Sequence, residues 1–479
     1  MKKISLCLAF GLLSLAGMAK DGYNVKVKIN DMKDSLVYLV HYYGKVSMVY
    51  KTDSVKLNNK GEGTFKSQQK LTGGIFLLLP EGKDRYFEFL LDNGDDISMS
   101  LDMKDVVNTI QFKGSEENIR FYDYQKYLVQ YDKDQTALKT KLEAARTKAD
   151  TQKLRDESGE MAKKLNQYRD DYRVKYPNTL LANIFGAVKE PEVPSEFPKM
   201  ADGKVDSSYG YRYFRSHYWD WFNLQDDRLI NTPIYNRKLE EYFNKVLPQV
   251  PDSIIPEADK ILAKTKGTSE LFKYTLTFLT YNAESSKIMG MDEVFVHLVE
   301  KYHMRGEAPW IDSALMGKII DRAYKIAPNL VGRRGQDLEL KTIADKPIKL
   351  YDVKSPYTLL VFWAPDCGHC RTELPRLDSV YRASLKSMGV KIMAVKTADG
   401  TIEEWKKFIE EKNLSKDWIH AYDPDRVSNY RYYYDVISTP TIYLLDDNKI
   451  IRGKKLGDDN ITGLVEFLQK KKKEGAKNN

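Results

Sequence analysis

Two cysteines, Cys367 and Cys370, stand two residues apart in the segment Trp363-Ala-Pro-Asp-Cys-Gly-His-Cys370. They follow an apolar run, Tyr357 to Trp363, that predicts a buried strand, and the residues after Cys370 predict a helix. Cys367 is therefore expected at a helix N-terminus, where the partial positive charge of unpaired N–H groups favours a thiolate. This spacing predicts a reversible disulfide in which Cys367 is the reactive thiol and Cys370 the resolving thiol.

The two side chains beside Cys367 are expected to act on its charge in opposite directions. His369, when protonated, favours the thiolate, whereas the carboxylate of Asp366 opposes it. An inert bridge or half of a metal site is the alternative for the cysteine pair. A zinc site needs four ligands, and no second cysteine pair exists to supply the others. We therefore expect no metal and no cofactor beyond the redox-active disulfide Cys367–Cys370.

These residues resemble a known family. The apolar strand, the CGHC loop, Glu373-Leu-Pro and Ser438-Thr-Pro-Thr441 look like thioredoxin-fold proteins of the TlpA/ResA type, which are exported thiol-disulfide oxidoreductases. The resemblance is specific over roughly residues 328 to 470. One departure is Asp366, where many thioredoxins have Trp.

The resemblance also implies roles for individual residues. Pro440, with Thr439 before it, is expected to be cis and to face the disulfide, as a cis X-Pro bond costs only about 0.5 to 1 kcal/mol. Thr439, Pro440 and Trp363 are then expected to bind substrate. Glu373, three places after the second cysteine, is expected to help move the thiol proton, and an exposed helix carboxylate without a role is the alternative.

Three questions about the reaction remain open in the sequence. Peroxiredoxins share this fold, but their reactive cysteine ends a Pro-x-x-x-Thr/Ser-x-x-Cys pattern with a hydroxyl residue three places before it. Ala364 stands at that place before Cys367, so we rank a peroxidase below dithiol exchange. The CGHC loop matches the fairly oxidising protein disulfide isomerases, whereas its surroundings look like the reductive TlpA/ResA type, so we favour a reductase. The partners are expected to be protein thiols or disulfides of the cell envelope and an electron donor or acceptor that the sequence does not identify.

The N-terminus and the charge balance indicate where the chain acts. Residues 1–19 predict a signal peptide, because Lys2 and Lys3 precede an apolar stretch and a small-residue end, Ala16-Gly-Met-Ala19. We expect an exported, periplasmic and soluble protein, since no later stretch reaches about 18 consecutive apolar residues. The net charge of +8 is a small excess of 76 basic over 68 acidic residues. Without a basic, aromatic-interleaved motif, it argues against nucleic-acid binding.

The remaining chain is expected to form several domains. Short alternating runs separated by turns such as Asn93-Gly94 predict an antiparallel β-sandwich over residues 20–113. A helical hairpin is expected over 114–190 and a helical spacer domain over 191–327, where apolar side chains recur at helical spacing. The α/β pattern of 328–479 predicts the thioredoxin-like domain. The fold class is thus multidomain, with an N-terminal β-sandwich, a central all-α region and a C-terminal thioredoxin fold.

The first two thirds of the chain carry no visible chemistry. They resemble uncharacterised modules that precede thioredoxin-like domains in exported bacterial proteins. The aromatic cluster Tyr209 to Phe222 is interpreted as core packing, with a peptide-recognition surface as the alternative. A second hypothesis for the whole chain is a cell-envelope binding or assembly protein whose thioredoxin domain is accessory.

Overall fold

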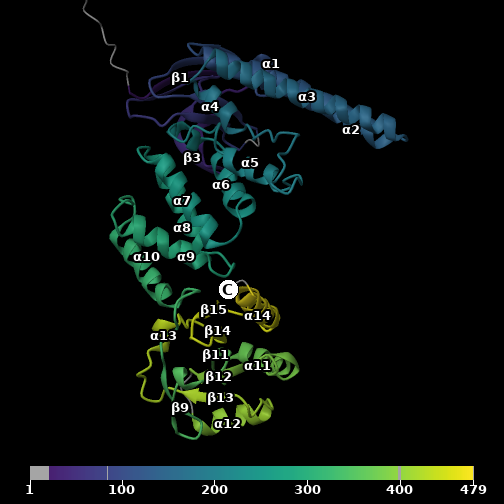
Figure 1. Cartoon of the computed structure of the whole chain (residues 1–479). Coiled ribbons are helices and arrows are strands. Elements are labelled where there is room, and N and C mark those ends of the chain that lie inside the picture. Colours follow the sequence, from purple (N-terminus) through teal and green to yellow (C-terminus); the bar gives the residue numbers. More distant parts are fainter. Residues whose placement is uncertain (1–20, 83–84, 398–400, 478–479) are drawn as a thin grey trace, which may run out of the picture. The chain divides into compact units, whose positions relative to one another are not determined.

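The computed structural model describes residues 21–82, 85–397 and 401–477 (Figure 1). The predicted signal peptide, residues 1–19, lies outside this part of the chain. Two compact units share the chain, the first formed by residues 1–247 and 263–274 and the second by 248–262 and 275–479. A search of the described helices finds no candidate for a membrane span.

The first unit begins with two four-stranded sheets, ordered β4–β1–β7–β8 and β3–β2–β5–β6. In β1, Val25 and Val27 are buried while Lys26 and Lys28 are exposed, so the alternating sequence presents one apolar face to the core. Among the described strands, β1 and β7 pair in parallel and the other neighbours of these sheets pair antiparallel. The strands are β1 Tyr23–Ile29, β2 Leu36–Tyr43, β3 Lys45–Lys56, β4 Glu62–Ser67, β5 Gly74–Pro80, β6 Phe87–Leu91, β7 Asp96–Leu101 and β8 Gln111–Lys113.

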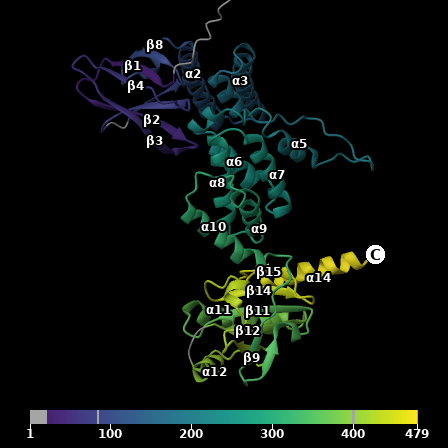
Figure 2. The same cartoon turned by 90° about the vertical axis from the view of Figure 1, so that its left-hand side faces the viewer.

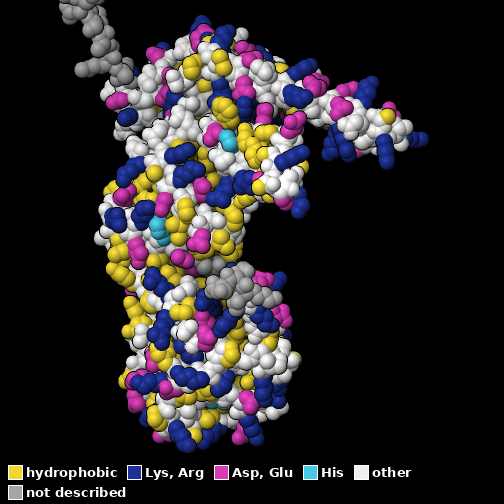
Figure 3. Space-filling view, in the orientation of Figure 1, with side chains coloured by type: hydrophobic (Ala, Val, Ile, Leu, Met, Phe, Trp, Pro, Cys, Tyr) yellow, Lys and Arg dark blue, Asp and Glu magenta, His cyan; other side chains and the backbone are white. Residues whose placement is uncertain are grey.

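The predicted helical hairpin is present as α2, Glu116–Ala144, and α3, Lys148–Lys175, which lie side by side (Figures 1 and 2). The side chains of Ser115 and Thr147 cap the two N-termini by accepting hydrogen bonds from backbone N–H groups. Basic and acidic side chains are interspersed over the hairpin surface (Figure 3), as expected of a solvated face. The other helices of this unit are α1 Val106–Thr109, α4 Leu180–Ala187, α5 Tyr209–His217, η1 Asp227–Asn231, α6 Tyr235–Glu241 and η2 Tyr242–Val246.

The aromatic cluster after α4 divides between core and surface. Tyr218 and Trp219 are buried and pack against Tyr242, Tyr218 by stacking and Trp219 edge to face, which confirms core packing for this part of the cluster. Trp221 is 42% exposed, and the cationic groups of Arg173 and Lys189 lie 4.7 Å and 4.6 Å from the centre of its ring. These cation–π contacts tie the exposed ring to its own unit.

The second unit joins helices to an α/β domain. The boundary between the units runs through α7, Pro251–Thr265, and α8, Glu270–Glu284. The helices that follow are α9 Met291–Leu298, η3 Val299–His303, α10 Ser313–Ile326 and η4 Ala327–Asn329. The apolar stripe predicted on α9 is buried at Phe295, whereas in the stripe predicted on α10 Ala323 is buried and Leu315 is exposed.

The C-terminal domain is a seven-stranded sheet in the order β10–β9–β13–β12–β11–β14–β15. Strand β11, inside the sheet, pairs in parallel with β12 and antiparallel with β14. The strands are β9 Glu339–Thr342, β10 Pro347–Lys349, β11 Tyr357–Trp363, β12 Val390–Lys396, β13 Ile419–Tyr422, β14 Thr441–Asp446 and β15 Ile451–Lys454. The helices are η5 Leu350–Asp352, α11 Gly368–Val380, η6 Tyr381–Leu385, α12 Ile402–Glu411, α13 Tyr430–Tyr433 and α14 Ile461–Lys477.

Every residue of β11 is buried, because both faces of this strand are covered. Leu359 and Trp363 face a core that includes side chains of α11, α12 and α14. Leu360 and Phe362 face a second core that includes Tyr430 of α13 and the buried Tyr434. These two cores fix the end of β11, which carries the cysteine loop. The architecture confirms the predicted β-rich, all-α and thioredoxin-fold regions.

Candidate active site: the Cys367–Cys370 dithiol

The two cysteines lie where β11 ends and α11 begins. Cys367 is the N-cap residue of α11, and its Sγ accepts a hydrogen bond from the backbone N–H of Cys370 at 3.4 Å. The Cys367 thiol can also donate to the carbonyl oxygen of Thr439 at 3.1 Å. Both cysteines are free thiols in this structure. A fully buried strand is therefore followed directly by the Cys367 sulfur at a helix N-terminus.

The two thiols have opposite environments. Partial burial acts to raise the pKa of Cys367, but its interaction with Thr439 and hydrogen bonds from the N–H groups of Cys370 and His369 outweigh it, so its pKa lies below the ordinary 9.0. Cys370 is fully buried, and desolvation raises its pKa to about 12. Cys367 therefore loses its proton at a lower pH than Cys370, because the pKa of the two thiols is shifted in opposite directions.

The rates at which Cys367 and Cys370 are alkylated should depend differently on pH. The rate at Cys367 is expected to follow its thiolate fraction, which grows as the pH rises through the pKa, so the half-maximal rate should fall below pH 9.0. Cys370 should stay unmodified over the same range, because it is buried and its pKa is about 12. Iodoacetamide modification of the native chain, followed by mass spectrometry, measures both. A midpoint at or above pH 9.0 for Cys367 would contradict this assignment.

A hollow of about 280 Å³ opens beside Cys367. It is lined by Ala364, Asp366, Cys367, Thr397, Arg431, Val436, Ile437, Ser438 and Thr439. The Thr439–Pro440 peptide bond is cis, as predicted, and Pro440 is half-buried. Thr439 thus lies beside Cys367, with Pro440 next to it in the chain.

The three charged residues predicted near the thiols lie at the surface of α11 and its loop. Asp366 is exposed and lines the hollow, while His369 is exposed and directed at Glu373, with 3.7 Å between Nδ1 and Oε1. Glu373 is half-buried one helical turn beyond Cys370, on the same face of α11. The imidazole of His369 therefore faces a carboxylate, and His369 helps to lower the pKa of Cys367 through its backbone N–H, after the larger effects of Thr439 and Cys370.

The substrate-contacting role predicted for Trp363 is wrong in this structure. Its side chain is fully buried and packs against Phe408, with 4.7 Å between ring centres. The physical reason is the alternation of β11, which turns this side chain into the core beneath the helices. Trp363 thus packs in the core under the cysteine loop, and its side chain is not accessible to a substrate.

Several residues of the hollow were not predicted from the sequence, among them Thr397, Arg431, Val436 and Ile437. Arg431 is exposed, Ile437 is 73% exposed, and Val436 is buried. The isoleucine directly before Ser438-Thr-Pro was the signal that sequence reasoning could have used.

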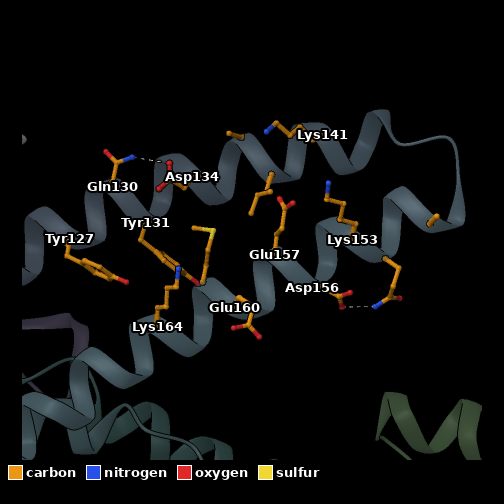
Figure 4. A pocket seen from close by; sticks show the side chains of 15 residues that line it. Tyr127, Gln130, Tyr131, Asp134, Lys141, Lys153, Asp156, Glu157, Glu160 and Lys164 are labelled. Atoms are coloured by element: carbon orange, nitrogen blue, oxygen red, sulfur yellow. Dashed lines mark hydrogen bonds between the residues drawn. The ribbon is translucent and has the colours of Figure 1, made fainter.

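Other candidate sites in the described residues offer less chemistry. No cluster of three or more metal-binding side chains is found in residues 21–82, 85–397 and 401–477. A larger hollow of about 1030 Å³ lies between α2 and α3, where Tyr127, Tyr131 and Met161 are among the lining side chains (Figure 4). Its hydrogen bonds include Gln130 to Asp134 at 2.9 Å within α2. Its lining contains no thiol or imidazole, so it does not compete with the dithiol as a redox site.

Comparison with known families divides the chain into three parts. Residues 331–454 match the AhpC/TSA family, which places the dithiol inside this match. Residues 150–326 match a domain of unknown function, DUF5106, and residues 23–121 match a second one, DUF4369.

Individual relatives are similar to the C-terminal part. The thiol-disulfide oxidoreductase ResA of Bacillus thuringiensis subsp. konkukian is 30% identical over 141 residues, which cover 29% of this chain and 78% of ResA. The thioredoxin-like protein YneN of Bacillus subtilis is 26% identical over 132 residues, covering 26% of this chain and 71% of YneN. A solved domain of a possible thiol-disulfide isomerase from Cytophaga hutchinsonii is 32% identical, with a TM-score of 0.29, and covers 31% of this chain and 98% of that chain. Through its C-terminal thioredoxin fold, this chain belongs to the ResA-like thiol-disulfide oxidoreductases.

Proposed function

We propose that this chain is an exported thiol-disulfide oxidoreductase that reduces protein disulfides through Cys367 and Cys370. The observation that carries the proposal is the contrast between the two sulfurs. One is partly exposed at a helix N-terminus with a lowered pKa, and the other is buried with a pKa of about 12. A nucleophile that ionises more readily than the resolving thiol beside it suits stepwise disulfide exchange.

In the proposed reaction, the Cys367 thiolate attacks one sulfur of a substrate disulfide. The substrate S–S bond breaks, a mixed disulfide forms with Cys367, and the first substrate sulfur leaves as a thiolate. Cys370 then loses its proton and attacks the Cys367 sulfur, which forms the Cys367–Cys370 disulfide and releases the second substrate thiolate. Two electrons pass to the substrate, and a dithiol donor must return them to the chain.

The neighbouring residues support these steps in different ways. Thr439 and Pro440 would hold the substrate chain along the hollow, since Thr439 already contacts the Cys367 sulfur. Glu373 would accept the proton from Cys370, because it lies one turn further along the same face of α11. His369 would tune the thiolate through its N–H group and its pairing with Glu373, and Asp366 would limit the depression of the Cys367 pKa.

We further propose that the chain is exported and that electrons flow from its dithiol to the substrate. The pattern of residues 1–19 supports export to the periplasm, where protein disulfides are available as substrates. The similarity to ResA supports a reductase, and it gives no support to the alternative of a binding or assembly protein with an accessory thioredoxin domain.

The reduction potential of the Cys367–Cys370 couple tests the proposal. The chain is equilibrated with glutathione buffers, quenched with acid, and its free thiols are alkylated and counted. We expect one intramolecular disulfide per chain, with a potential nearer the about −270 mV of thioredoxin than the about −120 mV of DsbA. A potential near the upper value would contradict the reductase direction, and failure to form the disulfide at any ratio would contradict the proposed function.

A further inference from the structure

We propose that the helical segment before the thioredoxin domain positions the substrate loop, residues Asp435–Pro440, through an ion pair between Arg322 of α10 and Asp435. This inference rests on the proposed function, because it takes the loop beside Cys367 as the surface that meets the substrate. It assigns a task to a segment that matches only a domain of unknown function. Both residues belong to the second unit of the chain. Arg322 is thus a positioning residue, because it acts through Asp435 and lies outside the lining of the hollow at Cys367.

The ion pair is close and largely hidden from water. Arg322 Nη1 lies 2.6 Å from Asp435 Oδ1, and the Asp435 side chain is 1% exposed while that of Arg322 is 25% exposed. Lys455 Nζ lies 3.8 Å from the other carboxylate oxygen, beyond hydrogen-bond distance. A buried carboxylate is costly unless it is paired, so Arg322 determines where Asp435 can sit.

The position of Asp435 determines the position of the loop that directly follows it. The backbone of Asp435 lies in the left-handed region with φ of +46°, which Asp tolerates better than most residues. Its carbonyl oxygen accepts a hydrogen bond from the N–H of Ile437 at 3.0 Å, and the N–H of Val436 donates to the Arg431 carbonyl at 3.2 Å. A tight turn therefore connects the buried carboxylate to the wall of the hollow.

That wall is the surface at which a substrate would meet Cys367. Val436, Ile437, Ser438 and Thr439 line the hollow in succession, and the Thr439 carbonyl lies 3.1 Å from the Cys367 sulfur. A shift of Asp435 would move these side chains while leaving Cys367 on α11. Because the reacting sulfur stays in place, a small shift of the loop is expected to weaken substrate binding and to leave the chemical step nearly unchanged.

A second buried contact holds the helical segment against the same domain. Lys454 of β15, 4% exposed, pairs with Asp292 of α9 at 2.5 Å. Tyr434, directly before Asp435, is anchored inside the domain because its hydroxyl donates to the Gln336 carbonyl at 2.6 Å. The loop is thus fixed by the domain at Tyr434 and by α10 at Asp435.

The test compares Arg322→Ala, Arg322→Lys and a matched control, Lys325→Ala, in the full-length chain. Lys325 is on the same helix, and its ion pair with Asp321 at 2.7 Å is exposed. We expect Arg322→Ala to raise the KM for a peptide disulfide at least about fivefold while kcat stays within about twofold, the pattern of lost binding. Amide hydrogen exchange should speed up in residues 431–441 and not in the rest of the sheet. Arg322→Lys should restore part of both effects, and Lys325→Ala should match the wild type.

The outcomes separate this inference from the proposed function. If Arg322→Ala matches Lys325→Ala in both KM and exchange, or speeds exchange throughout the sheet, the positioning role is wrong. If the wild type shows no disulfide exchange at all, the proposed function fails, and amide exchange still decides whether Arg322 fixes the loop. Should Arg322→Ala not fold, Asp435→Asn replaces it, because Asn keeps the left-handed backbone and removes the charge.

Discussion

Replacing Cys367 by serine is expected to lower the rate of disulfide reduction at least about 1000-fold, because the nucleophile of the first step is lost. A serine hydroxyl does not ionise near neutral pH, so the hydrogen bonds that lower the pKa of Cys367 have no thiolate to stabilise. Turnover of a peptide disulfide, followed by the appearance of free thiols, measures the effect. A Cys367→Ser protein that turns over disulfides at the wild-type rate would defeat the proposed mechanism.

Replacing Cys370 by serine should have a different effect. Cys367 can still attack, but no thiol resolves the mixed disulfide, so covalent complexes with substrate should accumulate and turnover should stop after one event. Thr372→Ala is the matched control, since Thr372 is exposed on the same helix. Complexes are detected on non-reducing gels and disappear on addition of a reductant. Equal amounts of complex with both cysteine variants would contradict the assigned order of attack.

Replacing Trp363 by alanine is expected to lower the free energy of unfolding of the C-terminal domain by about 3–5 kcal/mol, the usual cost of removing a buried Trp. Trp363 is fully buried in the core that contains side chains of α11 and α12. Because Cys370 is buried in the same core, its alkylation in increasing urea reports the unfolding of this domain.

The controls for this prediction distinguish a core residue from a substrate contact. Trp363→Phe should lose less stability, since no described residue accepts a hydrogen bond from the Trp363 indole N–H. Ile437→Ala removes a side chain that is 73% exposed and should change the free energy of unfolding by less than about 0.5 kcal/mol. If Trp363→Ala instead kept full stability and raised the KM for substrate, the role predicted from the sequence would be restored.

Sequence patterns predicted the C-terminal domain well because its signals are local. The run Tyr357–Trp363 became β11 with both ends as expected, and the capping box of Thr401 and Glu404 begins α12. In the N-terminal region, β3, Lys45–Lys56, was missed because none of its residues is buried and its sequence lacks a clear alternation. The parallel pairing of β1 with β7 was also missed, since partners more than 70 residues apart leave no local pattern.

For the site, the sequence identified the sulfurs but not all of their surroundings. Cys367 and Cys370 could be assigned from spacing alone, because a strand–loop–helix pattern places them at a helix N-terminus. The residues that line the hollow could not be assigned in this way, because Arg431 and Ile437 are more than 60 residues away from Cys367 in the chain. Burial likewise reversed the role predicted for Trp363.

The amino-acid sequence by itself determined the chemistry of this protein, a dithiol with one sulfur at a helix N-terminus, because residue type and local helical geometry are properties of neighbouring residues. The tertiary structure alone decided how strongly burial raises the pKa of Cys370 and which side chains face the Cys367 sulfur. Desolvation of Cys370, the contact between Cys367 and Thr439, and the pairing of Arg322 with Asp435 all arise between segments distant in the chain or buried by folding. Burial and long-range contact depend on the packing of the whole domain, so no local pattern could reveal them.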